Sequence, residues 1–266
     1  MSGSVERGAP PPTAAILAIA LNTFREAVRD RILYLLLAFA LILIVVSRLL
    51  SLLTVGNEEK IIKDVGLSAI SVFGVLTAVF VGVSLVFKEI ERKTVYTLLA
   101  NPVRRWQFVV GKFGGLLAVL AMNLALMSLA LFGVLLLRGE SPWSLVPAIL
   151  MILVELAMIT AFALLFSSLT NPVLAALFTA SIYVVGHLSW SLKLLKEKMP
   201  QSFGRWLCDV FYVLLPNLDR LNLKVQAVRG ISLEPGTLPL ALTYGLGYSV
   251  LILALACWAF ERKDFA

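Results

Sequence analysis

The stretch KEIERKTVYTLLANPVRRWQFVVGK, from Lys88 to Lys112, is a charged and polar block set between two long apolar runs. A Lys, an Arg or an acid costs roughly 2.5 to 3.5 kcal/mol at the middle of a bilayer. We therefore expect this block to lie in water on one side of a membrane, with a spanning helix on either side of it. Its eight charged side chains are Lys88, Glu89, Glu91, Arg92, Lys93, Arg104, Arg105 and Lys112.

The composition of the whole chain points the same way. Of 266 residues, 60% are hydrophobic and only 15% are charged, and the mean hydropathy is +0.93. These values exclude an ordinary soluble domain. The apolar runs leave no room for a separate catalytic or nucleotide-binding domain. The formal net charge is +7, but many cations flank apolar runs, which favours lipid headgroups over nucleic acid as their partner.

The hydropathy pattern predicts an all-α integral membrane protein with six transmembrane helices. We expect a disordered tail over residues 1–12, with no apolar segment typical of a cleavable signal peptide, and a single membrane domain over residues 13–266. Residues 13–31 predict an amphipathic helix that lies along the membrane surface. The six spans are predicted at approximately residues 32–55, 67–87, 109–137, 145–166, 173–192 and 238–260.

The distribution of Lys and Arg predicts the orientation. An even number of spans places both termini on one side, and the two short loops on the other side hold only Lys60, Lys63 and Arg138. The longer segment 193–237 carries seven more basic residues there, but long segments weigh less in the positive-inside rule. We therefore expect both termini and the central block to be cytoplasmic. The cations on that side are Arg7, Arg25, Arg29, Arg31, Lys88, Arg92, Lys93, Arg104, Arg105, Lys112, Arg262 and Lys263.

The outer segment between the last two spans predicts amphipathic helices. Apolar residues recur in it at helical spacing, which is typical of a helix lying on the outer leaflet or capping the bundle. A second short helix is predicted between Pro216 and Gly230. Two interpretations remain open, a lid over the helix ends and a gate or docking site. The apolar positions of the two helices are Phe203, Trp206, Leu207, Val210, Phe211 and Leu214, and then Leu218, Leu221, Val225 and Val228.

Motifs of enzymes and metal sites are absent from the sequence. It contains no GxxxxGK[ST] loop, no HExxH and no Cys/His cluster with metal-ligand spacing. The two cysteines, Cys208 and Cys257, lie in different segments. We expect no catalytic site, no metal and no cofactor on this chain, so ATP-driven work would require a separate ATPase.

Three ionisable residues fall inside predicted spans: Arg48, Glu155 and His187. Glu155 is near the middle of its span, so its side chain should face protein, water or a basic partner rather than lipid. Arg48 and His187 are in the outer halves of theirs, where Arg48 can extend outward to the headgroups. Two hypotheses remain open, a structural pairing between helices or across a dimer, and a path for substrate or protons.

The central block has an internal order. Glu89 with Arg92 and Lys93, and Lys88 with Glu91, form i, i+3 and i, i+4 pairs typical of a short helix, which the pair Asn101–Pro102 ends. A rigid charged helix held between two spans is suited to be a lever, because a partner that pushes on it moves both. The alternative is a plain cytoplasmic loop that only sets the orientation.

The same residues carry a family resemblance. The runs EIERKT at 89–94, LLANPVRR at 98–105 and GK at 111–112 resemble the permease subunits of ABC exporters of the second superfamily, the ABC-2 type. Within it they are similar to the branch associated with multicopper enzyme maturation and to the permease of nitrous-oxide-reductase maturation. The six-span order and LPNL at 215–218 fit as well, so the resemblance covers nearly the whole chain. Many members carry Gly where this chain has Lys93.

The resemblance implies an architecture and a function. It implies a homodimeric permease of the bacterial cytoplasmic membrane, each copy bound to a separate ATPase that holds ATP and Mg²⁺, and a translocation path near the first, second and fifth spans. A periplasmic accessory protein would be a further partner. The residues implied to couple to the ATPase are Glu89, Glu91, Arg92, Lys93, Thr94, Arg104 and Arg105.

We therefore expect the permease subunit of an ATP-driven exporter, which is not itself an enzyme. Two other classes remain as alternatives. One is a membrane scaffold that transmits ATPase motion to a periplasmic partner without moving cargo. The other is an intramembrane enzyme, which would need a polar cluster at one depth on facing helices.

Overall fold

The computed structural model describes residues 11–51, 57–91, 104–188, 216–231 and 235–262, and for residues 86 and 88–91 it describes the backbone alone. Within these ranges the regular structure is helical, which confirms the all-α class. The long helices are α1 (Pro12–Val28), α2 (Arg31–Ser51), α3 (Glu58–Glu91), α5 (Arg105–Leu136), α6 (Val146–Leu169), α7 (Pro172–His187) and α11 (Thr237–Arg262). The short ones are η1 (Trp143–Leu145), η2 (Leu218–Leu221) and α10 (Lys224–Arg229).

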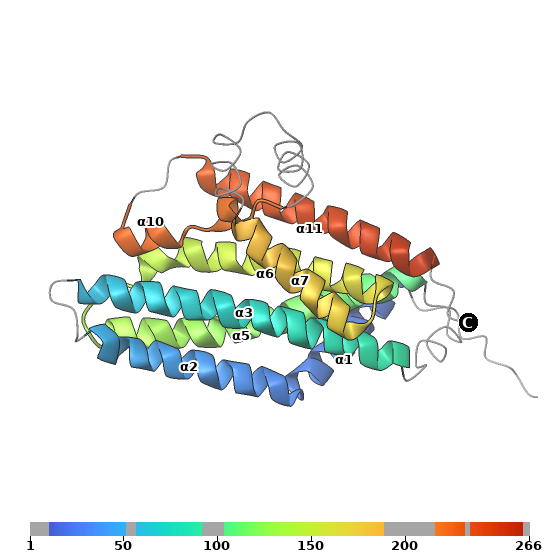
Figure 1. Ribbon diagram of the computed structural model, residues 1–266, viewed down its shortest axis with the longest axis horizontal. Helices are drawn as coiled ribbons and strands as arrows, with labels where there is room; N and C mark the ends of the chain where they lie inside the picture. The colour runs from blue at the N-terminus through green and yellow to red at the C-terminus, as the bar shows by residue number, and fades with distance from the viewer. Residues whose placement is uncertain (1–10, 52–56, 92–103, 189–215, 232–234, 263–266) are drawn as a thin grey trace, which may run out of the picture.

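Most of the long helices run along the long axis of the molecule (Figure 1). In the order α2, α3, α6, α11, each packs against the next. Helix α5 also contacts all four of these helices, and α7 crosses obliquely over α3 and α6. The start of α2, the ends of α3 and α11, and α1 therefore lie at one end of the bundle, whereas the start of α3 and α10 lie at the other (Figure 1).

Five of these helices are long and apolar enough to cross a membrane: Arg31–Ser51, Glu58–Leu85, Arg105–Leu136, Trp143–Leu169 and Thr237–Arg262. They correspond to five of the six predicted spans. The other one, predicted at 173–192, is represented by α7, which has 16 residues. A helix of that length covers about 24 Å of a hydrocarbon core about 30 Å thick. Six spans therefore stay a prediction.

Several helix boundaries differ from those predicted, and two of them have a local cause in the sequence. The first helix ends at Val28 rather than residue 31, because Asp30 Oδ1 accepts a hydrogen bond from the Ile32 N–H (2.9 Å) at the start of α2. The second span is part of a longer helix, α3, which includes most of the expected polar loop. There Glu59 forms an ion pair with Lys63 one turn later, a pairing that stabilises a helix.

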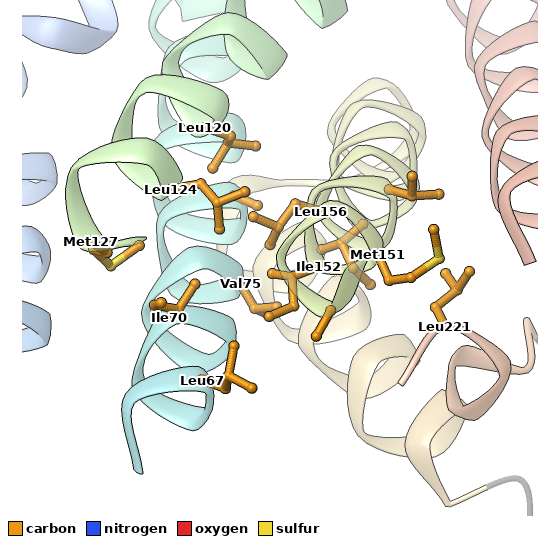
Figure 2. Packing of buried hydrophobic residues seen from close by; sticks show 14 of the residues in the cluster. Leu67, Ile70, Val75, Leu120, Leu124, Met127, Met151, Ile152, Leu156 and Leu221 are labelled. Carbon is orange, nitrogen blue, oxygen red and sulfur yellow. The ribbon is translucent and has the colours of Figure 1, made fainter. Parts of the chain in front are cut away.

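Helix α6 lies at the centre of the hydrophobic core. It is apolar on every side, which is typical of a helix surrounded by others. Figure 2 shows Met151, Ile152 and Leu156 of α6 beside side chains from α3 and α5, with Leu221 of the outer segment nearby. A second cluster, at the end where α5 begins, includes Phe108 of α5 and Phe260 of α11.

Two glycines of α5 allow α1 to lie directly on its backbone. A Cβ placed on Gly111 would be 2.8 Å from the Cβ of Ile19, and one placed on Gly115 would be 2.5 Å from the carbonyl oxygen of Ala20. Small residues four apart are a common means of close helix contact in membranes. The sequence analysis placed the first helix on the membrane surface, and the structure adds that α5 is its packing partner.

Substituting one of these glycines tests this contact. We expect G115A to force α1 away from α5, since the obstructing atom is a backbone oxygen, and to destabilise the protein by roughly 1 to 3 kcal/mol. The adjacent variant G114A is the control, because its Cβ would meet nothing closer than 3.8 Å. Thermal unfolding in detergent should give a lower Tm for G115A and an unchanged or higher Tm for G114A. Equal Tm values for the two variants would contradict the contact.

Candidate functional site

The predicted coupling residues lie where α3 ends and α5 begins. Helix α3 continues without a break through Glu89 and Glu91, whereas the sequence predicted the span to end at residue 87 and a separate helix to follow. Because Lys88, Glu89 and Glu91 are not helix breakers, nothing in this sequence ends the helix at residue 87. Arg92, Lys93 and Thr94, the rest of the predicted short helix and the Asn101–Pro102 break fall outside the described residues.

The start of α5 is held against the end of α11. Gln107 Oε1 accepts a hydrogen bond from the Arg104 N–H (2.9 Å), which caps the first turn of α5. The guanidinium of Arg105 donates to the carbonyl oxygen of Glu261 (3.0 Å) in the last turn of α11, where a cation also suits the helix dipole. The rings of Phe108 and Phe260 stack beneath this contact with centroids 5.5 Å apart. Arg104 is exposed and Arg105 is engaged within the chain.

The sequence predicted that the whole charged block lies in water, but Lys112 does not. It is only 1% exposed, and its Nζ is 5.8 Å from the ring centroid of Phe108, within the range of a cation–π contact. The physical reason is its place two turns inside α5, where the helix is already covered by its neighbours. The water-facing part of the block therefore does not extend to Lys112.

A second polar site surrounds Glu155. This side chain is 1% exposed in the middle of α6, and its Oε1 lies 3.5 Å from His187 Nε2 on α7. The distance fits an ion pair, but the geometry does not make a hydrogen bond. The Nδ1 of His187 is 3.3 Å from the carbonyl oxygen of Tyr183, to which it can only donate. A neutral imidazole would then turn a lone pair toward the carboxylate, so the contact is favourable only with a proton on His187 or on Glu155.

Two hydroxyl side chains border the Glu155–His187 pair. Tyr183 lies one turn before His187 on the same face of α7, and the two rings are 4.7 Å apart. The hydroxyl of Tyr183 is 3.5 Å from that of Ser71 on α3. The polar site therefore joins α3, α6 and α7, and it draws together groups that the sequence separates by more than 100 positions.

The outer segment contributes a cation to the same site. Lys224, the first residue of α10, is half-buried and lies within electrostatic range of Glu155 and of Asp64 on α3. Burial lowers the pKa of Lys224, while the negative charges of Glu155 and Asp64 act in the opposite direction. No direct ion pair joins Lys224 to Glu155 among the described residues, so their attraction acts over a longer distance. It acts in a protein interior that screens charges less than water does.

Residues 216–230 lie over the helix ends at the end of the bundle where α3 begins (Figure 1). We call them the outer cap, after the orientation that the sequence predicts. Leu218 packs directly against Gly186 of α7, because a Cβ added to Gly186 would be 2.7 Å from the Leu218 side chain. Leu221 packs beside Gly245 of α11. The N–H of Asn217 donates to the hydroxyl of Tyr244 (2.8 Å). The cap therefore contacts α6, α7 and α11 through η2, and α3 and η1 through α10.

The cap contains the predicted helical segment before Gly230, but the residues that this segment buries differ from the predicted ones. Leu218 and Leu221 are buried as predicted, but Val225 is 53% exposed. Leu223 and Ala227 are buried instead. The segment is divided into η2 and α10, so one helical period does not describe both parts. The predicted helix at 203–214 lies outside the described residues.

Polar side chains also line a cavity of about 560 Å³ between the cap and the start of α11. Its size falls within the usual range of small-molecule pockets. Its lining includes Asp219, Arg220, Asn222 and Gln226 of the cap and Tyr244 of α11. The guanidinium of Arg220 lies over the ring of Tyr244, 5.3 Å from its centroid.

Arg48, the third predicted intramembrane residue, is not part of the polar site. It is exposed in the last turn of α2, and α2 packs mainly on α3 and α5. Glu155 and His187 lie close together, and both hypotheses for them, a structural pairing and a path for substrate or protons, stay predictions. Tyr183 was detectable from its i, i+4 spacing to His187, but Ser71 and Lys224 were not, because only the fold brings their helices together.

Among the described residues, no group of three or more His, Cys, Asp or Glu side chains is arranged to hold a metal ion. Glu155 and His187 supply two such ligands, and the nearby positive charge of Lys224 opposes a cation. The polar site is therefore better suited to holding charges of the chain itself.

Comparison with known proteins agrees with this membrane architecture. No curated protein matches the chain. The family model described as "ABC-2 family transporter protein" matches residues 17–265, which is nearly the whole chain from α1 to beyond the end of α11. Members of this family form the membrane component of an ABC transporter, work with an ABC ATPase subunit and are not themselves the catalytic subunit. The chain belongs to the ABC-2 transporter family and is a membrane permease component.

Proposed function

We propose that this chain is the permease subunit of an ATP-driven exporter of the bacterial cytoplasmic membrane. In this proposal, residues 88–105 contact a separate ATPase that binds ATP and Mg²⁺. The observation that carries it is the common location of α1, the end of α3, the start of α5 and the end of α11 at one end of the bundle (Figure 1). The resemblance to the maturation branch of the family supports export as the direction.

The charges at the two ends support a cytoplasmic location for residues 88–105. At the opposite end, Lys63 is paired with Glu59 and Arg138 with Glu58. At the end that we propose to be cytoplasmic, Arg104 is exposed and the flanks are rich in basic residues. The positive-inside rule counts Lys and Arg in short loops, and the two short loops at the opposite end hold only Lys60, Lys63 and Arg138.

The packing supports a lever. Helix α3 has 34 residues, so at about 1.5 Å per residue it spans roughly 51 Å, which exceeds the hydrocarbon core. Its partner α5 is held to α1 through Gly111 and Gly115 and to α11 through Arg105. Force applied between residues 91 and 105 would therefore reach α1, α3, α5 and α11 together. In this mechanism, ATP closes the ATPase dimer and the paired helices tilt to change access to the path.

Exposed apolar side chains support a homodimer with a path near α2, α3 and α7. Most apolar residues of helix α3 are at least partly buried, yet Val72 and Phe80 are 45% and 47% exposed. Neighbouring residues of α2 and α7, such as Leu43 and Leu177, are exposed as well. These surfaces suit either lipid or a second copy of the chain. In the proposed dimer the second copy covers part of them.

The outer cavity, whose lining includes the charged residues Asp219 and Arg220, favours a second candidate, a scaffold that passes ATPase motion to a periplasmic partner without moving cargo. Its Asp219 and Arg220 are exposed and available to a protein on the outer side. Vesicles that contain the permease and its ATPase separate the two functions. ATP-dependent loss of a co-purified compound from the vesicle exterior supports transport, whereas ATPase cycling with no flux of any such compound supports the scaffold.

Reversing two charges tests the coupling segment. We expect E91R/R92E to weaken binding of the ATPase at least about tenfold, because like charges would then face each other across the contact. The variant should keep the wild-type Tm, since these positions lie at or beyond the end of α3. The measurement is the affinity of the purified ATPase for permease in nanodiscs. The matched control, E58R/R138E, reverses an ion pair at the other end and should bind normally.

Two adjacent arginines should have different roles. We expect R105A to lower the free energy of unfolding by about 1 kcal/mol, because it removes the hydrogen bond to Glu261, and to affect the ATPase less than R104A does. R104A should leave stability unchanged and reduce the stimulation of ATP hydrolysis by the permease, because Arg104 is exposed. Tm and ATPase rates of both variants check this. The assignment of Arg104 is wrong if the ATPase hydrolyses ATP as fast with the R104A permease as with the wild-type permease.

A further inference from the structure

The outer cap turns one cation toward the interior of the bundle. Apolar contacts hold most of the cap, with Leu218 beside Gly186 and Leu221 beside Gly245. Lys224 differs from these because its charge is half-buried at the point where the cap crosses from η2 to α10. A buried ammonium is unfavourable unless negative charge compensates it.

Glu155 is the buried source of that negative charge. Lys224 is within electrostatic range of two acids, Glu155 and Asp64, but Asp64 is exposed and its field is weakened by water. Glu155 is 1% exposed, so its charge acts through protein. The dependence is mutual, since a carboxylate at this depth also needs cations near it.

His187 connects Glu155 to the cap by a second route. Its Nε2 is 3.5 Å from the Glu155 carboxylate, and the preceding residue, Gly186, is the one on which Leu218 of the cap packs. The carbonyl oxygen of Pro216 is also close, 3.0 Å from a Cβ placed on Gly186. The contacts therefore link Glu155 to the cap near Pro216 through the last turn of α7, and Glu155 also lies within electrostatic range of Lys224 at the start of α10.

We propose that Glu155 is an ionic anchor for the outer cap, whose carboxylate, together with Lys224 and His187, keeps residues 216–230 closed over the outer ends of α3, α6 and α7. Glu155 is a positioning residue in this proposal and contacts no cargo. The anchoring requires no ATPase, so its test stands apart from that of the transport function. A neutral residue at 155 leaves Lys224 buried with a weaker partner, and the cap then opens more often.

Reactivity of a buried cysteine in the cap measures this opening. Ala227 is 7% exposed and lies one turn after Lys224 on the same face of α10. The variant A227C, in the full-length chain with C208S and C257S, is reconstituted in nanodiscs and treated with a membrane-impermeant maleimide. The labelling rate is then proportional to the fraction of time that the cap is open. It is compared in E155Q, in K224M and in the double variant.

We expect E155Q and K224M each to raise the labelling rate at least about tenfold. The increase in the double variant should be smaller than the product of the two single increases, because removing both partners leaves no buried charge unpaired. The matched control is T160V. Thr160 is buried in α6, and its hydroxyl bonds only to its own helix, so this variant should label like the parent.

Three results would overturn the anchor. One is parental labelling in E155Q, and another is a double variant whose effect equals the product of the single effects. If E155Q yields no folded protein, its folding should be rescued by adding K224M, and the absence of rescue is the third.

Discussion

A charge inside a membrane protein is costly unless water or an opposite charge lies next to it, and this constraint accounts for most of the polar features at the two ends of the bundle. The charged block from residue 88 lies beyond the apolar part of α3, and α5 resumes at Arg105, where its guanidinium meets the carbonyl of Glu261. In the interior, the same constraint brings His187 and Lys224 toward Glu155, the one acid that is buried among the described residues. The polar start of α5 and the position of the cap both agree with this constraint.

The helices differ in what surrounds them, and this difference suggests how motion is distributed. Helices α3 and α6 are covered by neighbours over most of their length, whereas α2 and α11 keep broad apolar surfaces exposed. Interiors of close-packed side chains move as units, so α3 and α6 are suited to transmit displacement. The exposed surfaces of α2 and α11 face lipid or a second subunit, where sliding disrupts fewer contacts. Glu155, on the most central helix, lies between the end of the bundle where α5 begins and the cap at residues 216–230 (Figure 1).

Much of the fold was predictable from the sequence, because membrane spans are set by length and polarity. Five spans and a helical segment before Gly230 followed from these properties, and so did the common location of the end of α3, the start of α5 and the end of α11 (Figure 1). The extent of α3 did not, since the sequence EEKIIKD is polar enough for a loop but carries the Glu59–Lys63 pair of a helix. Of the polar site, Glu155 and His187 were identified by their cost in lipid, whereas Lys224 and Ser71 were not, because their positions depend on how the chain folds back. The burial of Lys112 was missed for the same reason.

The central claim is that a water-facing segment between α3 and α5 is held by a separate ATPase on the cytoplasmic side. Photo-crosslinking in intact cells tests it most directly, with a photoreactive amino acid in place of Thr94. The account predicts one major crosslinked product, which contains the ATPase subunit and increases when ATP hydrolysis is blocked in the closed state. A product that lacks any ATP-binding protein, or one formed with a protein outside the cytoplasm, would contradict it.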